Sequence, residues 1–367
     1  MELIQAEIEA VKISAYTIPT DAPESDGTLS WDSTTLVVAE LHSGRLTGLG
    51  YTYGNQATAV VMQHLAEKVL LSQKSLDISR LHTLMLRQVR NDGATGICAM
   101  AVSALDIALW DLKAKVLGCP VADLLAGGAA SDAVAVYGSG GFTSYSDNEL
   151  SRQLSQWAED GIRGVKMKVG SDPDRDPERV ATARRAIGAG VALFVDANGA
   201  YSAKQAMALA TRFAENGVSW FEEPVSSDHL ADLRRIRDSV PAGMDVAAGE
   251  YGYDSFYFRR MLANRAVDVL QLDATRCHGF TGFLAAACLA ESFGCPLSAH
   301  CAPTLHMHVA CSLPGFRHVE YFHDHVRIER MLFDGFIPAR DGCLAPDRSR
   351  PGLGLTLKRQ DAERFAV

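Results

Sequence analysis

Six charged residues recur along the second half of the chain, and each lies at the end of a short apolar run. They are Lys168, Asp196, Glu222, Glu250, Asp273 and His300. Successive members are 23 to 28 residues apart, which is about the length of one strand, one helix and their loops in a βα barrel of roughly 250 residues. Such a barrel carries its chemistry at the C-terminal ends of its strands, so successive strands would deliver these groups to one place. The spacing therefore predicts an enzyme.

Three of the six are carboxylates that end consecutive strands, Asp196 in LFVDANG, Glu222 in WFEEPV and Glu250 in DVAAGEY. Three carboxylates in one barrel mouth would repel one another strongly unless a cation neutralised them. Because every ligand atom is an oxygen, the set favours a hard ion, Mg²⁺ above Mn²⁺ or Ca²⁺, and disfavours zinc. Only one of Glu222 and Glu223 can face the barrel axis, and we assign Glu222 as the ligand with Glu223 behind it.

Two lysines, Lys166 and Lys168, stand two positions apart in the run VKMKVG, so they share one face of a strand. The apolar residues between them, Val165, Met167 and Val169, should then pack outward under the helices and leave both lysines inside the barrel. A second ammonium beside the first should depress the pKa of a buried lysine. The pair therefore predicts a lysine that can act as a base near neutral pH.

Asp273 and His300 end adjacent predicted strands. A carboxylate bonded to one imidazole nitrogen fixes the tautomer and raises the basicity, so the other nitrogen can take a proton. Glu320, in the last predicted strand, is expected to complete the ring as an acid bonded to a carboxylate oxygen of the substrate. A metal triplet with a base on either side suits abstraction of the proton α to a carboxylate, because a divalent cation can stabilise the enediolate that forms.

The elements that would position these residues follow from the pattern of apolar runs beyond residue 130. Eight strands are predicted, at 133–141, 165–170, 193–199, 220–225, 245–251, 267–276, 296–303 and 316–322, and helical runs separate most of them. This alternation predicts a parallel sheet, and eight strands favour a closed barrel. We place the barrel at 128–344, and residues 345–367 as a segment that returns to the first domain.

Residues 1–127 predict an α+β domain, in which an antiparallel sheet is followed by helices. Residues 2–16 are expected to form a strand, 17–33 a polar loop, and 34–54 a hairpin that turns at Ser43 and Gly44. Helices are expected at 57–71, 79–90 and near 97–117.

Composition limits the class of partner and the compartment. The chain has 367 residues, a net charge of −9 and no basic cluster, which disfavours nucleic acid and anionic membranes as partners. The eight cysteines are scattered and none forms CxxC, so neither a zinc knuckle nor a disulfide scaffold is supported. The first residues lack a signal-peptide core, and we expect a cytoplasmic protein.

In order and spacing, these motifs resemble those of the enolase superfamily, in particular its mandelate racemase-like branch. The matching segments are KMK at 166–168, DAN at 196–198, EEP at 222–224, GE at 249–250 and the Asp273–His300 pair. The segment SALDIALWDLKAKVLGCPVADLLAGG resembles the last helix of the family's capping domain and the entry to its barrel. The resemblance covers nearly the whole chain and implies a modified (β/α)7β barrel, an α/β fold, with an α+β cap.

The resemblance also implies a cofactor, further site residues and a state of assembly. The cofactor is Mg²⁺, Asn198 contacts substrate, and Arg276 stands where many relatives have a lysine. His325 is close enough to the last strand to touch substrate, whereas the other histidines of HMH (306–308) and HDH (323–325) are interpreted as rim or helix residues. Relatives form dimers to octamers, which makes a homo-oligomer the expectation.

The expected reaction is dehydration of a sugar acid to a 2-keto-3-deoxy acid. Lys168 or His300 would abstract the α proton, and protonated His300 would help to expel the 3-hydroxyl. The polar stretch between residues 16 and 35 should close over the far end of a polyol, with Trp31 and Tyr53 in the same pocket. It contains no Lys, Arg or His, which disfavours a diacid. Alternatives are a racemase, epimerase or lactone cycloisomerase on a hydroxy acid and, more remotely, a sugar-acid-binding protein without catalysis.

Overall fold

A computed structural model describes residues 6–128 and 130–367. The first part is a cap with a three-stranded antiparallel sheet, in the order β1 (Ala10–Ser25), β2 (Ser30–Ser43) and β3 (Leu46–Tyr53). Its helices are α1 (Ala57–Leu65), the π-helical turn η1 (Ala66–Leu70), α2 (Ile78–Gln88), α3 (Ile97–Leu117) and α4 (Val121–Ala126). The expected α+β cap and the hairpin turn after Ser43 are therefore confirmed.

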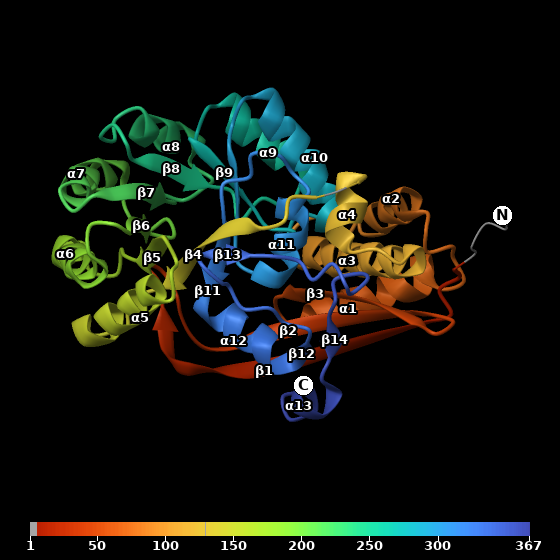
Figure 1. Ribbon diagram of the computed structural model, residues 1–367. Coiled ribbons are helices and arrows are strands. Elements are labelled where there is room, and N and C mark those ends of the chain that lie inside the picture. Colours follow the sequence, from red (N-terminus) through yellow and green to blue (C-terminus); the bar gives the residue numbers. More distant parts are fainter. Residues whose placement is uncertain (1–5, 129) are drawn as a thin grey trace.

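The expected loop at 17–33 is wrong. β1 and β2 continue their pairing to Ser25 and Ser30, with one irregularity between Pro19 and Glu24. The strands are joined by a tight turn in which an Asp26 carboxylate oxygen accepts hydrogen bonds from the backbone of Thr28 and Leu29. Residues 17–33 have a polar composition because they extend beyond the cap core. They run toward α5 and the C-terminal end of β4 (Figure 1). The first strand of the cap also begins later than expected, at Ala10; residues 1–5 lie outside the described part.

The long helix α3 packs directly against β3, and small residues allow the close approach. A Cβ built at Gly50 would lie 2.1 Å from the carbonyl oxygen of Ala104, so a larger residue there would push the helix off the sheet. The contact fixes α3 beneath the cap sheet, and the same helix also reaches the barrel. Thr281 donates to Asp106 and accepts from the Trp110 indole. The cap and the barrel are thus joined by partly buried polar contacts as well as by apolar packing.

The second part is a closed barrel of eight parallel strands, as expected from the sequence (Figure 1). The strands are β4 (Val134–Gly140), β5 (Gly164–Lys168), β6 (Ala192–Asp196), β7 (Val218–Glu222), β8 (Asp245–Ala248), β9 (Val269–Leu272), β10 (Leu297–Ala299) and β11 (Val319–Phe322). Each strand pairs in parallel with the next, and β11 pairs with β4 to close the ring.

Seven helices connect these strands in turn and form the outer layer. They are α5 (Asp147–Glu159), α6 (Asp176–Ile187), α7 (Ala203–Ala214), α8 (Leu230–Arg237), α9 (Ser255–Ala263), α10 (Gly279–Ser292) and α11 (Pro303–Cys311). Capping boxes begin two of them, with Ser146 and Glu149 at α5 and Ser202 and Gln205 at α7. Seven βα units followed by a last strand give the (β/α)7β arrangement.

The last segment runs back across both parts. After α12 (His323–Leu332), β12 (Phe333–Asp334) pairs with β14 (Thr356–Leu357), and β13 (Cys343–Leu344) pairs antiparallel with β4. The chain then forms α13 (Arg359–Glu363) and meets the free edge of β1, where Thr17 donates to Phe365 and Val367 donates to Ala15. None of the helices in the described ranges is long and apolar enough to cross a membrane.

The barrel core has two layers that alternate along each strand. Val165, Met167 and Val169 are fully buried in the apolar layer shared with the outer helices, as expected. The inner layer holds a separate aromatic cluster that includes Tyr137 and Trp220. Because side chains alternate along a strand, Asp196 and Glu222, two positions after the inner residues Phe194 and Trp220, face the axis near the C-terminal mouth. That register brings these two carboxylates into the barrel, whereas Glu250, Asp273 and His300 follow the ends of their strands.

Candidate active site

The predicted charged residues lie at one end of the barrel, in register on neighbouring strands. Lys168 ends β5 and is paired with Asp196 at the end of β6, which in turn is paired with Glu222 at the end of β7. Asp273 and His300 directly follow β9 and β10. The βα repeat therefore places all of them at the C-terminal mouth.

Three carboxylates form one compact group: Asp196, Glu222 and Glu250 each offer an oxygen, and these oxygens lie within 4.8 Å of one another. All three residues are buried. Burial and the Asp196 carboxylate raise the pKa of Glu222 well above its usual range. The Oε2 atom of Glu250 makes no hydrogen bond with the described residues. A buried group with this excess of negative oxygen fits a hard divalent cation, and the neighbouring Glu223 lies outside the triplet.

Lys166 lies beneath the carboxylates and is completely buried. Its ammonium is 2.6 Å from Glu222, 2.8 Å from Glu320 and 3.4 Å from Asp196. Those three contacts compensate the desolvation that burial of an ammonium would otherwise carry. Lys166 thus holds carboxylates of β6, β7 and β11 together, and it does not line the cavity above.

Lys168 does line the cavity, with its ammonium 2.6 Å from Asp196 and 3.1 Å from the Asn198 side-chain oxygen. The expectation of a depressed lysine pKa is wrong for this arrangement. Burial and the Lys166 ammonium lower the pKa of Lys168, but the Asp196 and Glu250 carboxylates outweigh them, and the pKa lies above its ordinary value. The spacing along the strand predicted that the two lysines share a face. The fold, and not the spacing, brings the Asp196 and Glu250 carboxylates close to Lys168.

The Asp273–His300 pair has the expected hydrogen bond, with His300 Nδ1 2.8 Å from an Asp273 oxygen. Burial raises the pKa of Asp273, but the bond to His300 reverses that effect and holds the pKa well below its usual range. The other Asp273 oxygen accepts from the backbone and hydroxyl of Thr275. An ionised Asp273 therefore favours the proton on Nδ1 and leaves Nε2 as the nitrogen that exchanges protons in the site.

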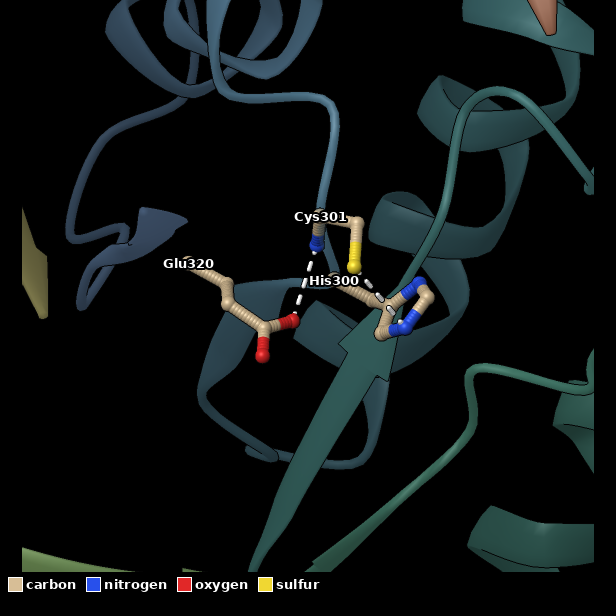
Figure 2. Close-up of side chains that lie close together, drawn as sticks. All are labelled: His300, Cys301 and Glu320. Atoms are coloured by element: carbon tan, nitrogen blue, oxygen red, sulfur yellow. Dashed lines mark hydrogen bonds between the residues drawn. The ribbon is translucent and has the colours of Figure 1, made fainter. Parts of the chain in front are cut away.

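Figure 2 shows Cys301 between His300 and Glu320. Its sulfur lies 3.2 Å from His300 Nε2, and its backbone N–H donates to Glu320 at 2.9 Å. Glu320 also accepts from the Ser139 hydroxyl at 2.6 Å. Sequence reasoning missed Cys301 because it considered cysteines only in CxxC pairs. The position immediately after His300, at the end of a barrel strand, was the signal that could have found it.

A cavity of about 300 Å³ lies over these groups, between the cap and the barrel mouth. From the barrel it is lined by Lys168, Asn198, Glu250, Tyr251, Asp273, Thr275, Arg276, His300, Cys301, Glu320, Phe322 and His325, and from the cap by Asp26, Leu29, Trp31, Ser33, Thr34, Thr35, Tyr53 and Gly54. The predicted substrate-binding residues Asn198, Arg276, Trp31, Tyr53 and His325 are all among them. Asp196 and Glu222 are buried beneath the cavity and do not line it.

Besides Lys168 and His300, the basic residues that line the cavity are His325 and Arg276, and both have partners within the protein. His325 stacks on Tyr53 with ring centroids 3.4 Å apart and accepts a hydrogen bond from the backbone of Ala302. Burial lowers the pKa of His325 well below its usual range, so this ring is neutral. The Arg276 guanidinium is 3.4 Å from Glu250 and 3.7 Å from Asp273.

The remaining members of the two histidine pairs lie in helices or at the rim. His306 accepts from the backbone of Ala274 and bonds the Cys301 carbonyl, so it supports the loops that carry Asp273 and His300. His308 is buried in α11, and His323 faces Asp21 in the outer part of the β1–β2 hairpin, residues 17–33, which is called the cap hairpin below.

Fold and site together define a class, the two-domain barrel enzymes of the enolase superfamily. Residues 10–126 match the N-terminal domain of the mandelate racemase / muconate lactonizing enzyme family, and residues 149–362 match the enolase C-terminal domain-like family. The chain belongs to this mandelate racemase / muconate lactonizing enzyme family, as its motifs indicated.

Relatives are similar over nearly the full length. A solved mandelate racemase/muconate lactonizing enzyme-like protein from Rubrobacter xylanophilus is 49% identical, with a TM-score of 0.96 over 98% of this chain and 100% of that one. L-talarate/galactarate dehydratase from Salmonella typhimurium is 30% identical over 96% of this chain and 89% of its own length. Its structure liganded with Mg and L-lyxarohydroxamate has a TM-score of 0.88 over 97% and 92% of the two chains. D-galactarolactone cycloisomerase from Agrobacterium fabrum is 30% identical over 80% and 78%.

Proposed function

We propose that this protein is a Mg²⁺-dependent dehydratase that converts a sugar acid to a 2-keto-3-deoxy acid through an enediolate. One observation carries the proposal. The Lys168 ammonium and His300 Nε2 enter one cavity from different sides of the carboxylate triplet, because the strands of the triplet, β6, β7 and β8, together with β9, lie between β5 and β10. The similarity to a dehydratase that was solved with Mg supports the same reaction class.

Asp196, Glu222 and Glu250 are the residues that would hold the cation. When bound, Mg²⁺ supplies positive charge that neutralises the triplet and stabilises negative charge developing on the substrate carboxylate. Lys166 balances the two of these carboxylates that it contacts. Asn198, whose oxygen is 3.1 Å from the Lys168 ammonium, keeps that ammonium aimed at the cavity.

The proton chemistry belongs to the side chains. Lys168 or His300 takes the proton from C2 of the substrate, and the C–H electron pair moves into the carboxylate system. His300, protonated on Nε2, then gives a proton to the 3-hydroxyl, which leaves as water while the C2–C3 double bond forms. The resulting enol tautomerises to the 2-keto acid. The ionised Asp273 stabilises the imidazolium during this exchange, and Glu320 presents oxygens beside His300 and Cys301.

The cavity favours a monocarboxylic polyol acid over a diacid. The cap contributes an acid, hydroxyls and apolar rings to the lining, and none of its described lining residues is basic. On the barrel side, Arg276 is matched by Glu250 and Asp273, and His325 is neutral. A second substrate carboxylate would thus lack the guanidinium partner that such groups normally find.

A screen of the purified protein with Mg²⁺ against aldonic and aldaric acids, scored by 2-keto acid formation, tests the proposal. We expect turnover of an aldonic acid that stops when EDTA is added. Faster turnover of the aldaric acid of the same stereochemistry, such as galactarate over galactonate, would contradict the monoacid preference alone.

A second candidate, isomerisation of a hydroxy acid or its lactone, is favoured by the similarity to the Agrobacterium cycloisomerase. It uses the same α-proton abstraction but conserves mass. If the screen produces no keto acid, exchange of the α proton in D₂O over the same compounds distinguishes an isomerase from a protein that only binds its ligand. We also propose a homo-oligomer, by analogy with the family, and light scattering would measure its mass.

A further inference from the structure

Outside the catalytic cavity, where the cap hairpin meets the barrel, lies a separate group of possible metal ligands. Asp21 and Glu24 come from the far half of β1, and His323 is the first residue of α12. Each offers one donor atom, and the three donors lie within 4.8 Å of one another. His323 Nε2 is 3.0 and 3.1 Å from the two Asp21 oxygens. None of the three lines the catalytic cavity.

Glu24 shows that this group is more than a surface cluster. The residue is only 1% exposed, and one carboxylate oxygen accepts from the Trp31 indole at 2.7 Å. The other oxygen, Oε1, is buried and has no hydrogen-bond partner among the described residues. An unpartnered carboxylate oxygen inside a protein is unfavourable, so a ligand is expected to satisfy it.

The charges around Glu24 point to the sign of that ligand. The carboxylates of Asp21 and Asp324 act on Glu24, and Arg327 is the cation that acts on it. Arg327 is already paired with Asp324 at 2.5 Å. Among the described residues no lysine or arginine is paired with Asp21 or Glu24, so a divalent cation would supply the opposite charge that these two carboxyl groups lack.

The position is open to ions from solution. Asp21 and His323 line a surface cavity of about 430 Å³ that is bounded on its other side by residues of α5. The side chains of Asp21 and His323 are 47% and 26% exposed. An ion can therefore enter from the α5 side without passing through the catalytic cavity.

We propose that Asp21, Glu24 and His323 bind a divalent transition-metal ion that fastens the cap hairpin to the barrel. One imidazole nitrogen with two carboxylates suits Mn²⁺, Co²⁺ or Zn²⁺ better than Mg²⁺, which prefers oxygen ligands alone. This donor set differs from the all-carboxylate triplet, so the two sites would prefer different metals.

The consequence reaches the catalytic cavity through Trp31. Glu24 holds the Trp31 indole, and Trp31 lines the cavity and packs edge-on against Phe142 with ring centroids 5.7 Å apart. Fixing Glu24 and His323 to one ion would therefore hold the hairpin over the cavity and slow its opening. The ion would act on the position of the cap hairpin and would take no part in the reaction.

The test is a Co²⁺ titration of the full-length protein, followed by calorimetry and by the visible absorption of cobalt. We expect two Co²⁺ per wild-type chain. Asp196→Asn should weaken the catalytic ion alone, and His323→Ala should remove the second ion alone. Asp21→Asn gives an independent removal of a ligand that is partly exposed. His64→Ala, which removes an exposed cap histidine outside the group, is the matched control and should keep both ions.

Hydrogen exchange supplies the structural readout. With Mg²⁺ present throughout, added Co²⁺ should slow amide exchange in residues 19–31 of the wild type and of His64→Ala, but not of His323→Ala. One Co²⁺ per wild-type chain, or two in both His323→Ala and Asp21→Asn, would overturn the proposal. Neither result depends on which acid the enzyme dehydrates, because no step of the test measures turnover.

Discussion

At the scale of single residues, the site is a balance between buried charges of opposite sign. Residue types and spacing predicted Lys168, the carboxylate triplet and the Asp273–His300 pair, because each follows a strand whose alternation fixes its direction. The sequence could not predict the electrostatic result. Whether a lysine near another lysine has a high or low pKa depends on carboxylates such as Asp196, which lies 28 residues away in the chain and 2.6 Å away in space.

Lys168→Ala is expected to lower kcat by about 10² to 10⁴-fold, the usual contribution of a positioned acid or base. The fold should persist, because the side chain borders the cavity rather than the apolar core. Steady-state kinetics on the substrate found in the screen would measure the loss, and circular dichroism would verify folding. Lys204→Ala, at an exposed position in α7, serves as the control and should behave as the wild type. Turnover by Lys168→Ala at the wild-type rate would remove this residue from the mechanism.

At the scale of elements, apolar runs predicted the barrel well because its strands are buried on both faces and are separated by amphipathic helices. The cap hairpin was predicted poorly for the opposite reason. Residues 17–33 are polar, and polar composition normally marks a loop, yet the backbone is held in two paired strands. Ile18 and Glu24 are buried, but the other side chains of the segment are partly or fully exposed, so the sequence of the strand shows no hydrophobic alternation.

Gly27, in the tip of this hairpin, is expected to control how closely the hairpin approaches the barrel loops beside the cavity. A Cβ at this position would lie 2.6 Å from the Ala197 carbonyl and 2.7 Å from the Val169 carbonyl, both in loops beside the site. Gly27→Ala should therefore lift the tip and raise KM several-fold, with little effect on unfolding of the barrel. Gly44→Ala, at a turn where nothing lies within 4 Å, tests whether general strain in the cap has the same effect. An unchanged KM in Gly27→Ala would show that the tip contact does not govern binding.

Glu329 in α12 connects the barrel to the cap, because it accepts from Tyr51 and from Thr304. Burial raises its pKa from 4.5 to about 7 despite these donors. The folded state therefore binds the proton more tightly than the unfolded state. This contribution to stability is fully present below pH 4.5 and is lost as pH rises to about 7, above which the effect is constant.

Glu329→Gln should consequently remove part of the pH dependence of stability. Urea unfolding of both proteins between pH 4.5 and 8 would measure it, and the variant should lose less stability across that interval, by at most about 3 kcal/mol. Parallel pH profiles for the two proteins would contradict the assignment.

At the scale of the whole molecule, the catalytic cavity exists only where the two parts of the chain meet. Barrel residues contribute most of the charged groups that line the cavity, and cap residues line its opposite side. The order of motifs along the chain identified this architecture because each motif belongs to a successive strand. It could not place Cys301 or the ligand group around Glu24, since these depend on how the loops and the hairpin approach one another.

Removal of Mg²⁺ is expected to destabilise the protein as well as to stop turnover, because the buried triplet would lose its compensating charge. A cation at about 100 times its Kd stabilises the folded state by about 2.7 kcal/mol. Melting curves with Mg²⁺ and with EDTA would show the difference, which Asp196→Asn should largely lack. Equal melting temperatures for the wild type under both conditions would argue against cation binding at the triplet.

The pairing of residues 365–367 with the outer edge of β1 also has a consequence for biosynthesis. β1 is made first, but the segment that covers its edge follows about 350 residues later. At the usual rate of synthesis that interval lasts roughly 20 to 70 s. Throughout it the backbone groups of Ala15 and Thr17 lack these partners, and an unpaired strand edge is a recognised site of aggregation. Yield in a recombinant host should thus depend on slowed translation or chaperone supply more than the stability of the finished fold would suggest.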